Sequence, residues 1–224
     1  MKTGKCRLFG VLAAALVCCG IMALVDGLWQ PGYGIKSAIK LAVFGLVPLV
    51  STQALGLTPM KELFRFQKKG FFLALGLGLG IYVLILGGYF LLRNVFDFSQ
   101  IAGSLTENAG VTKENFLFVS LYISFVNSLL EEFFFRGFLF RNMKELSGSR
   151  AAYSVSALLF AAYHIAMMLG WFGLGLNALV LLGLTVGGLI FNWLNEKLGC
   201  IYGSWLTHMF ANCAINPIGF LLLR

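Results

Sequence analysis

The sequence predicts an all-α protein, a polytopic transmembrane helix bundle with about seven spans. Of its 224 residues, 59% are hydrophobic and only 12% are charged, whereas about a quarter of the residues are charged in a typical soluble domain. The apolar runs are long and unbroken, while the strands of a membrane barrel alternate polar and apolar residues. The composition therefore excludes a soluble globular domain, a disordered chain and a nucleic-acid-binding domain.

Seven runs are apolar and long enough to cross a bilayer, which takes about 20 residues in a helix. They cover residues 8–25, 38–57, 71–92, 115–140, 151–169, 174–194 and 200–222. The first run follows Lys2, Lys5 and Arg7 as a signal peptide would, but no small-x-small cleavage site closes it before Asp26. We therefore expect an uncleaved anchor helix at the N-terminus.

The longest polar stretch divides the chain into three parts. We predict an N-terminal three-helix membrane region at 1–93, an external loop at 94–114 and a helical core at 115–224. Glycines within the spans are interpreted as sites of close helix approach, because small residues let membrane helices pack tightly. These glycines are Gly76, Gly78, Gly80, Gly183, Gly187 and Gly188.

The distribution of Lys and Arg predicts the orientation of the chain. If the N-terminus is cytoplasmic, twelve of the 17 basic residues lie on the inner side, where such residues accumulate in membrane proteins. The five on the outer side are Lys36, Lys40, Arg93, Lys113 and Arg224. We expect a multi-pass protein of the cell membrane, surrounded by the lipid bilayer, whose net charge of +8 reflects its loops and no nucleic-acid partner.

The fourth run contains two acids and an arginine, in the order Glu131-Glu132-Phe-Phe-Phe-Arg136. Ionisable side chains in membrane helices are costly and are candidates for function. Adjacent helical residues point about 100° apart, so the two carboxylates cannot share one direction. Glu132 and Arg136 are four residues apart and can form an ion pair. Glu131 is then free to face a polar cavity, although a buried ion pair near a helix end would account for the same pattern.

Both histidines of the chain also lie in spans. His164 ends the segment Phe160-Ala-Ala-Tyr-His164, and His208 lies four residues before Asn212, so that these two side chains share a helix face. Each group alone could simply form an interhelical hydrogen bond. At about 1.5 Å of rise per residue, however, Glu131, His164 and His208 lie at one level in the cytoplasmic half of the membrane. We therefore expect them to meet in one polar pocket.

This set of side chains favours hydrolysis by an activated water, because no Ser or Cys nucleophile lies beside a base. A carboxylate with an imidazole can take a proton from water, and a second histidine with an asparagine can donate hydrogen bonds to an oxyanion. Glu131, His164 and His208 are also ordinary zinc ligands, but no HExxH pair is present. We predict that no metal or other cofactor is required, with zinc as the alternative.

The three motifs, EExxxR at Glu131–Arg136, FxxxH at Phe160–His164 and HxxxN at His208–Asn212, resemble those of the CPBP family over residues 115–222. This family of CAAX proteases and bacteriocin-processing proteins is also called Abi. The resemblance implies an intramembrane endopeptidase of the glutamate type. Its substrate would be a membrane-associated peptide or protein, in CAAX-type or bacteriocin and peptide processing.

The resemblance also implies a role for each motif residue. Glu131 would be the general base that activates water, with help from His164. His208 and Asn212 would stabilise the oxyanion. Glu132, Arg136 and Phe160 would support these catalytic residues.

Two other functional classes are compatible with the same polar residues. One is a non-proteolytic membrane protein, for regulation or immunity, that uses the polar pocket for binding. The other is a transporter or proton relay, in which acid and histidine chains also occur. The sequence shows neither an inverted repeat nor broken helices in matching halves, as many transporters do.

Overall fold

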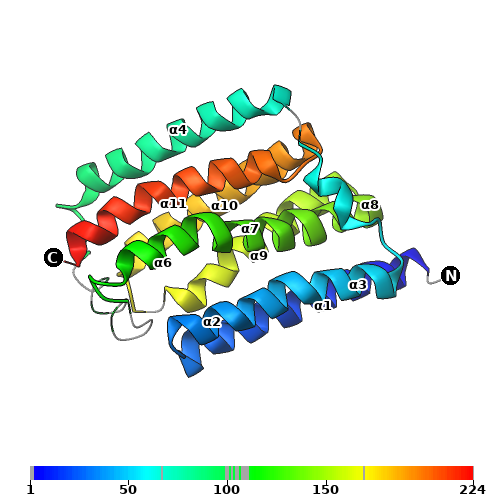
Figure 1. The fold of residues 1–224 in the computed structure, drawn as a ribbon, viewed down its shortest axis with the longest axis horizontal. Coiled ribbons are helices and arrows are strands. Elements are labelled where there is room, and N and C mark those ends of the chain that lie inside the picture. The colour runs from blue at the N-terminus through cyan, green and yellow to red at the C-terminus, as the bar shows by residue number, and fades with distance from the viewer. Residues whose placement is uncertain are drawn as a thin grey trace.

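The computed structural model describes residues 3–66, 68–98, 101, 103, 106, 111–168 and 170–223. The described residues form long helices and no strand (Figure 1), which confirms the predicted all-α bundle. The helical elements are α1 (Gly4–Leu24), η1 (Val25–Trp29), α2 (Tyr33–Lys40), η2 (Leu41–Leu46), α3 (Val47–Leu55), η3 (Met60–Phe64), α4 (Lys68–Leu92), α6 (Phe116–Tyr122), η4 (Ile123–Asn127), α7 (Ser128–Glu132), η5 (Phe133–Phe140), α8 (Arg141–Ser147), α9 (Ser149–Met167), α10 (Leu174–Leu198) and α11 (Tyr202–Leu222).

Each of the seven predicted spans coincides with a long helix of the described chain. Five of these helices are apolar and long enough to cross a membrane: Gly4–Trp29, Tyr33–Leu55, Gly70–Leu92, Phe116–Ser147 and Leu174–Leu198. The other two predicted spans form α9 and α11, whose polar side chains lower their mean hydropathy. Much of the predicted external loop at 94–114 lies outside the described residues.

The helices lie side by side with their long axes roughly aligned (Figure 1). The N-terminal elements α1, α2 and α3 cover one side of the bundle, and α4 lies along α11 at the other side. Between them run the long helix made of α6 to α8, together with α9, α10 and α11. The chain begins and ends at opposite ends of the bundle, as an odd number of traversals requires.

Aromatic side chains dock the second long helix against the fourth. Phe44 in η2 stacks on Phe134 with ring centroids 4.1 Å apart and an interplanar angle of 6°. The same ring meets Phe135 edge-on at 5.7 Å and lies 5.3 Å from Tyr163 of α9. Such aromatic pairs have specific geometry. They therefore fix the position of Lys40, which lies one helical turn before Phe44.

Two of the predicted close approaches between helices occur at glycine. A Cβ atom on Gly78 would lie 2.6 Å from Cδ2 of Phe210 in α11, and one on Gly188 would lie 3.0 Å from Cα of Ala157 in α9. At Gly188 the missing Cβ lets the two helix backbones come near, whereas at Gly78 it makes room for the ring of Phe210. The prediction was wrong for the remaining glycines, where an added Cβ would meet no atom within 4 Å. These are Gly76, Gly80, Gly183 and Gly187.

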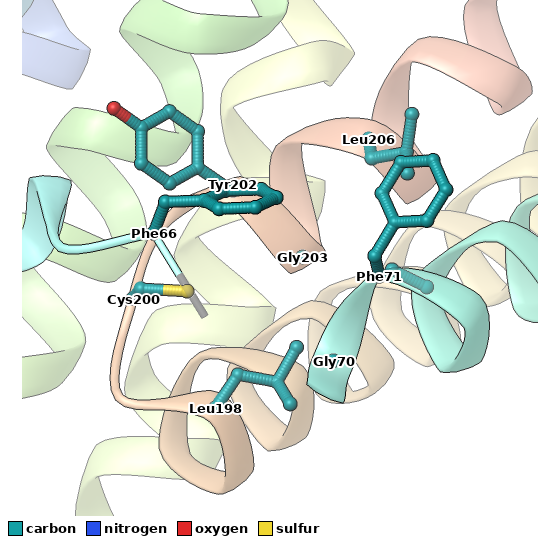
Figure 2. A pocket seen from close by; sticks show the side chains of 9 residues that line it. Phe66, Gly70, Phe71, Leu198, Cys200, Tyr202, Gly203 and Leu206 are labelled. Carbon is teal, nitrogen blue, oxygen red and sulfur yellow. The ribbon is translucent and has the colours of Figure 1, made fainter. Parts of the chain in front are cut away.

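A small hollow lies where the start of α4 meets the turn between α10 and α11 (Figure 2). Leu198 fills much of this region, because its methyl groups occupy the space that side chains on Gly70 and Gly203 would need. The lining residues are mostly apolar: Phe66, Gly70, Phe71, Ala74, Leu198, Cys200, Tyr202, Gly203 and Leu206. None of the predicted site residues is among them, so this hollow is a packing feature of the bundle.

Candidate active site

The two adjacent acids lie on a single α-helical turn between two π-helical segments. Glu131 and Glu132 belong to α7, which follows η4 and precedes η5 in one continuous helix. Their relative exposures are 3% and 0%. A π-helical segment adds a residue to the turn and changes the direction of the side chains that follow, and such segments are frequent at functional sites. Both carboxylates therefore face the interior of the bundle, although they point in different directions.

Glu132 forms the ion pair that its spacing predicts. Nη1 of Arg136 lies 3.2 Å from Oε1 of Glu132, and neither side chain is exposed. Nη2 of Arg136 donates a hydrogen bond of 3.3 Å to the carbonyl of Gly188. The guanidinium also lies over the ring of Phe160, 4.3 Å from its centroid. A buried charge requires such partners, so Arg136 anchors Glu132 against α9 and α10.

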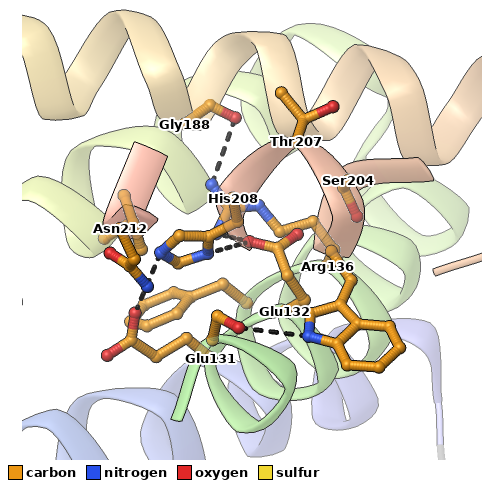
Figure 3. A network of polar contacts seen from close by, with 12 residues as sticks. Glu131, Glu132, Arg136, Gly188, Ser204, Thr207, His208 and Asn212 are labelled. Carbon is orange, nitrogen blue, oxygen red and sulfur yellow. Dashed lines mark hydrogen bonds and ion pairs between the residues drawn. The ribbon is translucent and has the colours of Figure 1, made fainter. Parts of the chain in front are cut away.

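His208 lies between the two carboxylates (Figure 3). Its Nδ1 is 2.9 Å from Oε1 of Glu132, and its Nε2 is 3.6 Å from Oε2 of Glu131. An ionised Glu132 can only accept a hydrogen bond, so this contact with an ionised Glu132 requires the proton to be on Nδ1. The distance on the other side is too long for a direct hydrogen bond. The ring stacks on Phe191 at 5.0 Å, which fixes its plane.

The second oxygen of Glu131 is bound by residues that the motifs do not include. Nζ of Lys40 lies 2.5 Å from Oε1 of Glu131, and Nδ2 of Asn127 donates to the same oxygen at 2.9 Å. Nζ of Lys40 also donates to Oδ1 of Asn127 at 2.5 Å. Lys40 is only 5% exposed. Its placement among the external basic residues was therefore wrong.

The physical reason for this error is the extent of the helix. Lys40 is the last residue of α2, but the helix continues through η2 and α3, so Lys40 lies inside the long helix Tyr33–Leu55 and not at its end. A signal was available in the sequence, because Lys40 falls within the predicted span 38–57. An ionisable residue inside a span is a functional candidate by default.

His164 is buried near Glu131 without a direct bond to it. Its Nδ1 lies 2.7 Å from the carbonyl oxygen of Phe160, and its ring packs against the Phe160 ring at 4.7 Å. The neighbouring Tyr163 ring lies 5.0 Å from Nζ of Lys40, which binds Glu131. The Phe160 ring also meets His208 edge-on at 5.8 Å. Phe160 thus packs beside both histidines and beneath Arg136, at the centre of the cluster.

Asn212 lies one turn after His208 on the same face of α11, as predicted (Figure 3). Its Nδ2 donates a hydrogen bond of 3.2 Å to the carbonyl of Ile123 in η4. Trp205, on the same helix, donates at 3.0 Å to the carbonyl of Phe125 in η4. The π-helical segment therefore supplies carbonyl groups that hold α11 in place. Backbone groups in a membrane require partners within the protein.

The described residues contain no group of three or more His, Cys, Asp or Glu side chains arranged to hold a metal ion. His208 directs its two nitrogens toward Glu132 and Glu131, and the Nδ1 of His164 faces a carbonyl oxygen. That no cofactor is required stays a prediction.

Comparison with known protein families gives one match. Residues 113–214 match the Rce1-like family, described as type II CAAX prenyl endopeptidase Rce1-like. The matched segment contains all three motifs and ends two residues after Asn212, whereas Lys40 lies outside it. Comparisons with curated proteins and with solved structures gave no match.

Proposed function

We propose that this chain, which carries an Rce1-like domain of the CPBP family at residues 113–214, hydrolyses a peptide bond with a water molecule activated by Glu131. The family implies an intramembrane endopeptidase, and the long apolar helices indicate a membrane protein. The proposal concerns the chemistry of this activity, its substrate and the residues responsible.

The contacts of Glu131 are the observation that carries the proposal. Its Oε1 receives two donors, from Lys40 and Asn127, whereas Oε2 faces His208 across 3.6 Å and receives no hydrogen bond from the described residues. A carboxylate oxygen without a donor is available to accept a proton. A water molecule that donates to Oε2 would be oriented by the same group that deprotonates it.

The proposed reaction uses the motif residues as follows. The water oxygen attacks the carbonyl carbon of the scissile bond while its proton passes to Oε2 of Glu131. The resulting oxyanion accepts hydrogen bonds from Nε2 of His208 and from the second N–H of Asn212, since the first is bonded to Ile123. The carbon–nitrogen bond then breaks, and the leaving amine takes the proton from Glu131. His164, whose ring packs against Phe160 beside the cluster, would assist Glu131.

To stabilise the oxyanion, His208 must donate a hydrogen bond from Nε2, which requires a proton on that nitrogen. Since Nδ1 donates to Glu132, His208 can donate from Nε2 only when both nitrogens carry protons. The charges of Lys40, Arg136, Glu131 and Glu132 sum to zero. With His208 doubly protonated and Glu131 holding the proton of the water, the cluster carries two positive charges, one of which offsets the negative charge of the oxyanion. Preorganised charge of this kind is often the largest contribution to catalysis.

The proposed substrate is a membrane-associated peptide or protein that ends in a CAAX sequence. The name of the matched family supports this class. Bacteriocin or peptide processing is the alternative, which the motif resemblance implies. We also propose a cytoplasmic N-terminus, which the excess of basic residues on that side supports. Labelling of the exposed thiol of Cys6 by a membrane-impermeant maleimide in intact cells would contradict this orientation.

The experiment that tests the reaction compares purified variants in detergent on an internally quenched farnesylated CAAX peptide. Glu131→Gln keeps the size of the side chain and removes the proton acceptor, so we expect kcat to fall by about 10²–10⁴-fold. Glu145→Gln is the matched control, because Glu145 lies on the same long helix with a partly exposed side chain outside the cluster. It should cleave like the wild type.

A chelator added to the wild-type protein tests the metal prediction in the same assay. We expect cleavage to continue unchanged, because the proposed chemistry uses only side chains. Undiminished cleavage by Glu131→Gln would refute the role of Glu131, and chelator-sensitive cleavage would move the chemistry to a metal ion.

A further inference from the structure

We propose that Lys40 is a positioning residue for Glu131, so that a helix outside the Rce1-like domain completes the active site. This inference rests on the proposed function. Lys40 would hold Oε1 of Glu131 and thereby direct Oε2 toward His208 and the attacking water. It would act through Glu131, without touching the substrate.

Lys40, Asn127 and Glu131 form a closed set of contacts. The ammonium group lies 2.5 Å both from Oε1 of Glu131 and from Oδ1 of Asn127, and the amide nitrogen of Asn127 donates to Oε1 at 2.9 Å. Charged donors form the stronger hydrogen bonds. Because Asn127 and Glu131 are one turn apart on the same helix, Lys40 bridges two groups that are already aligned.

The surroundings of Lys40 hold its ammonium in one place. Nζ lies 5.5 Å from the ring centroid of Phe44 and 5.0 Å from that of Tyr163. The Lys40 and Glu131 side chains are 6% and 4% exposed. A buried ammonium is tolerated only with an anionic partner, and here that partner is Glu131. Phe44 belongs to η2 and Tyr163 to α9, whereas Glu131 belongs to α7. Packing among three long helices therefore holds the ion pair in place.

The ion pair between Lys40 and Glu131 restricts the orientation of the Glu131 carboxylate. The terminal torsion of a glutamate is broad and is not fixed by rotamer preference. Two donors on Oε1 restrict that torsion, because rotating the carboxylate would break both bonds. The other oxygen then points to Nε2 of His208. Without Lys40, the carboxylate could turn and offer His208 either oxygen, and the reacting water would lose its fixed partner.

Lys36 provides a matched control in the same helix. It lies one turn before Lys40 in α2 and forms an ion pair of 2.7 Å with Asp26, whose side chain is 2% exposed. Loss of Lys36 therefore also leaves a buried carboxylate unpaired, but that carboxylate is no part of the proposed site. A purely structural role predicts similar results for Lys36→Met and Lys40→Met.

The first measurement separates kcat from KM for both variants on the farnesylated CAAX peptide. For Lys40→Met we expect kcat to fall by about 100-fold, the effect of a misplaced reacting group, with KM changed less than about threefold. Lys36→Met should keep kcat close to that of the wild type. Equal kcat values for the two variants would overturn the inference. If Glu131→Gln still cleaves the peptide, the proposed function itself fails, which is a separate outcome.

The second measurement is one of stability. It needs no cleavage activity, so it can also be made on a Lys40→Met protein that is poorly stable. Thermal unfolding is compared for Lys40→Met, Glu131→Gln and the double variant. Removing one partner leaves a buried charge unpaired, so the double variant should melt at a higher temperature than Lys40→Met alone. A double variant in which the two decreases simply add would show that the residues are not coupled, and the inference would be wrong.

Discussion

The Rce1-like domain and the helices that precede it contribute to the polar cluster in unequal ways. The domain supplies Glu131, Glu132, Arg136 and His208, which contact one another through ion pairs and a hydrogen bond. The preceding helices supply Lys40, held in place by aromatic packing. Motifs therefore identify the groups proposed to react, whereas the charge that neutralises Glu131 comes from a helix that the family match does not cover.

The first three long helices also differ among themselves. The second helix, from Tyr33 to Leu55, reaches the cluster, but α4 lies on the far side of α11. The extensive contact of α4 with α11 includes packing at Gly78 and a hydrogen bond of 3.2 Å from Thr207 to the carbonyl of Ala74. No hydrogen bond or ion pair joins a described side chain of α4 to Glu131, whose partners are Lys40, Asn127 and His208. We therefore expect changes in the second helix to alter catalysis, and changes in α4 to alter stability alone.

The largest expected effect is the loss of stability when a buried charge of the Rce1-like domain loses its partner. Arg136→Met leaves Glu132 without a positive partner in the interior, and loss of one partner of a buried pair costs about 3–5 kcal/mol. Arg141→Met removes a partly exposed ion pair of 2.7 Å with Glu62 and should cost at most about 1 kcal/mol. Thermal unfolding in detergent measures both. Similar losses for the two variants would show that burial does not distinguish these arginines.

An intermediate effect concerns the docking of the second helix. Phe44→Ala removes the ring that stacks on Phe134 and lies beneath Lys40. We expect a loss of about 2 kcal/mol, below the roughly 3–5 kcal/mol of a soluble core, because membrane helices gain packing but little hydrophobic energy on association. We also expect a lower kcat, since Lys40 loses part of its support. Phe72→Ala, at a ring of α4 that is 77% exposed, is the control and should change neither quantity.

If Phe44→Ala lowers stability but keeps the full kcat, the proposed difference between the second helix and α4 is wrong. The second helix would then be a structural support of the domain, as α4 is. Such a result would also weaken the positioning role of Lys40, because the two side chains share one packing environment.

The sequence predicted contacts within one helix better than contacts between helices. The pair of Glu132 and Arg136 followed from a spacing of four residues, and the structure confirms it. The spacing of His208 and Asn212 placed them on one face in the same way. The seven apolar runs gave the helices of the bundle because length and composition decide that outcome. These features depend only on helical periodicity and on the length and composition of each run, which a single sequence contains.

Contacts between helices depend on packing that a single sequence does not specify. His164 lies in the predicted cluster, but its contacts did not follow from the sequence: its Nδ1 faces the carbonyl of Phe160, and the Phe160 ring lies beside it. Lys40 was missed because it was counted with the flanking charges of its span. The π-helical segment η4 also could not be predicted, although it determines which carbonyl groups α11 binds.

The smallest expected effect tests the contrast between α4 and the second helix. Gly78→Ala places a Cβ 2.6 Å from Phe210, and the crowding should cost about 1–2 kcal/mol, since overpacking is destabilising. Gly76→Ala lies two residues earlier in open space and should be neutral or slightly stabilising, because alanine favours the helix over glycine. Because α4 is remote from Glu131, kcat should stay unchanged in both variants at a temperature where they are folded. A clear fall in kcat for Gly78→Ala alone would mean that displacement of α11 reaches His208, and α4 would then belong with the second helix as part of the catalytic framework.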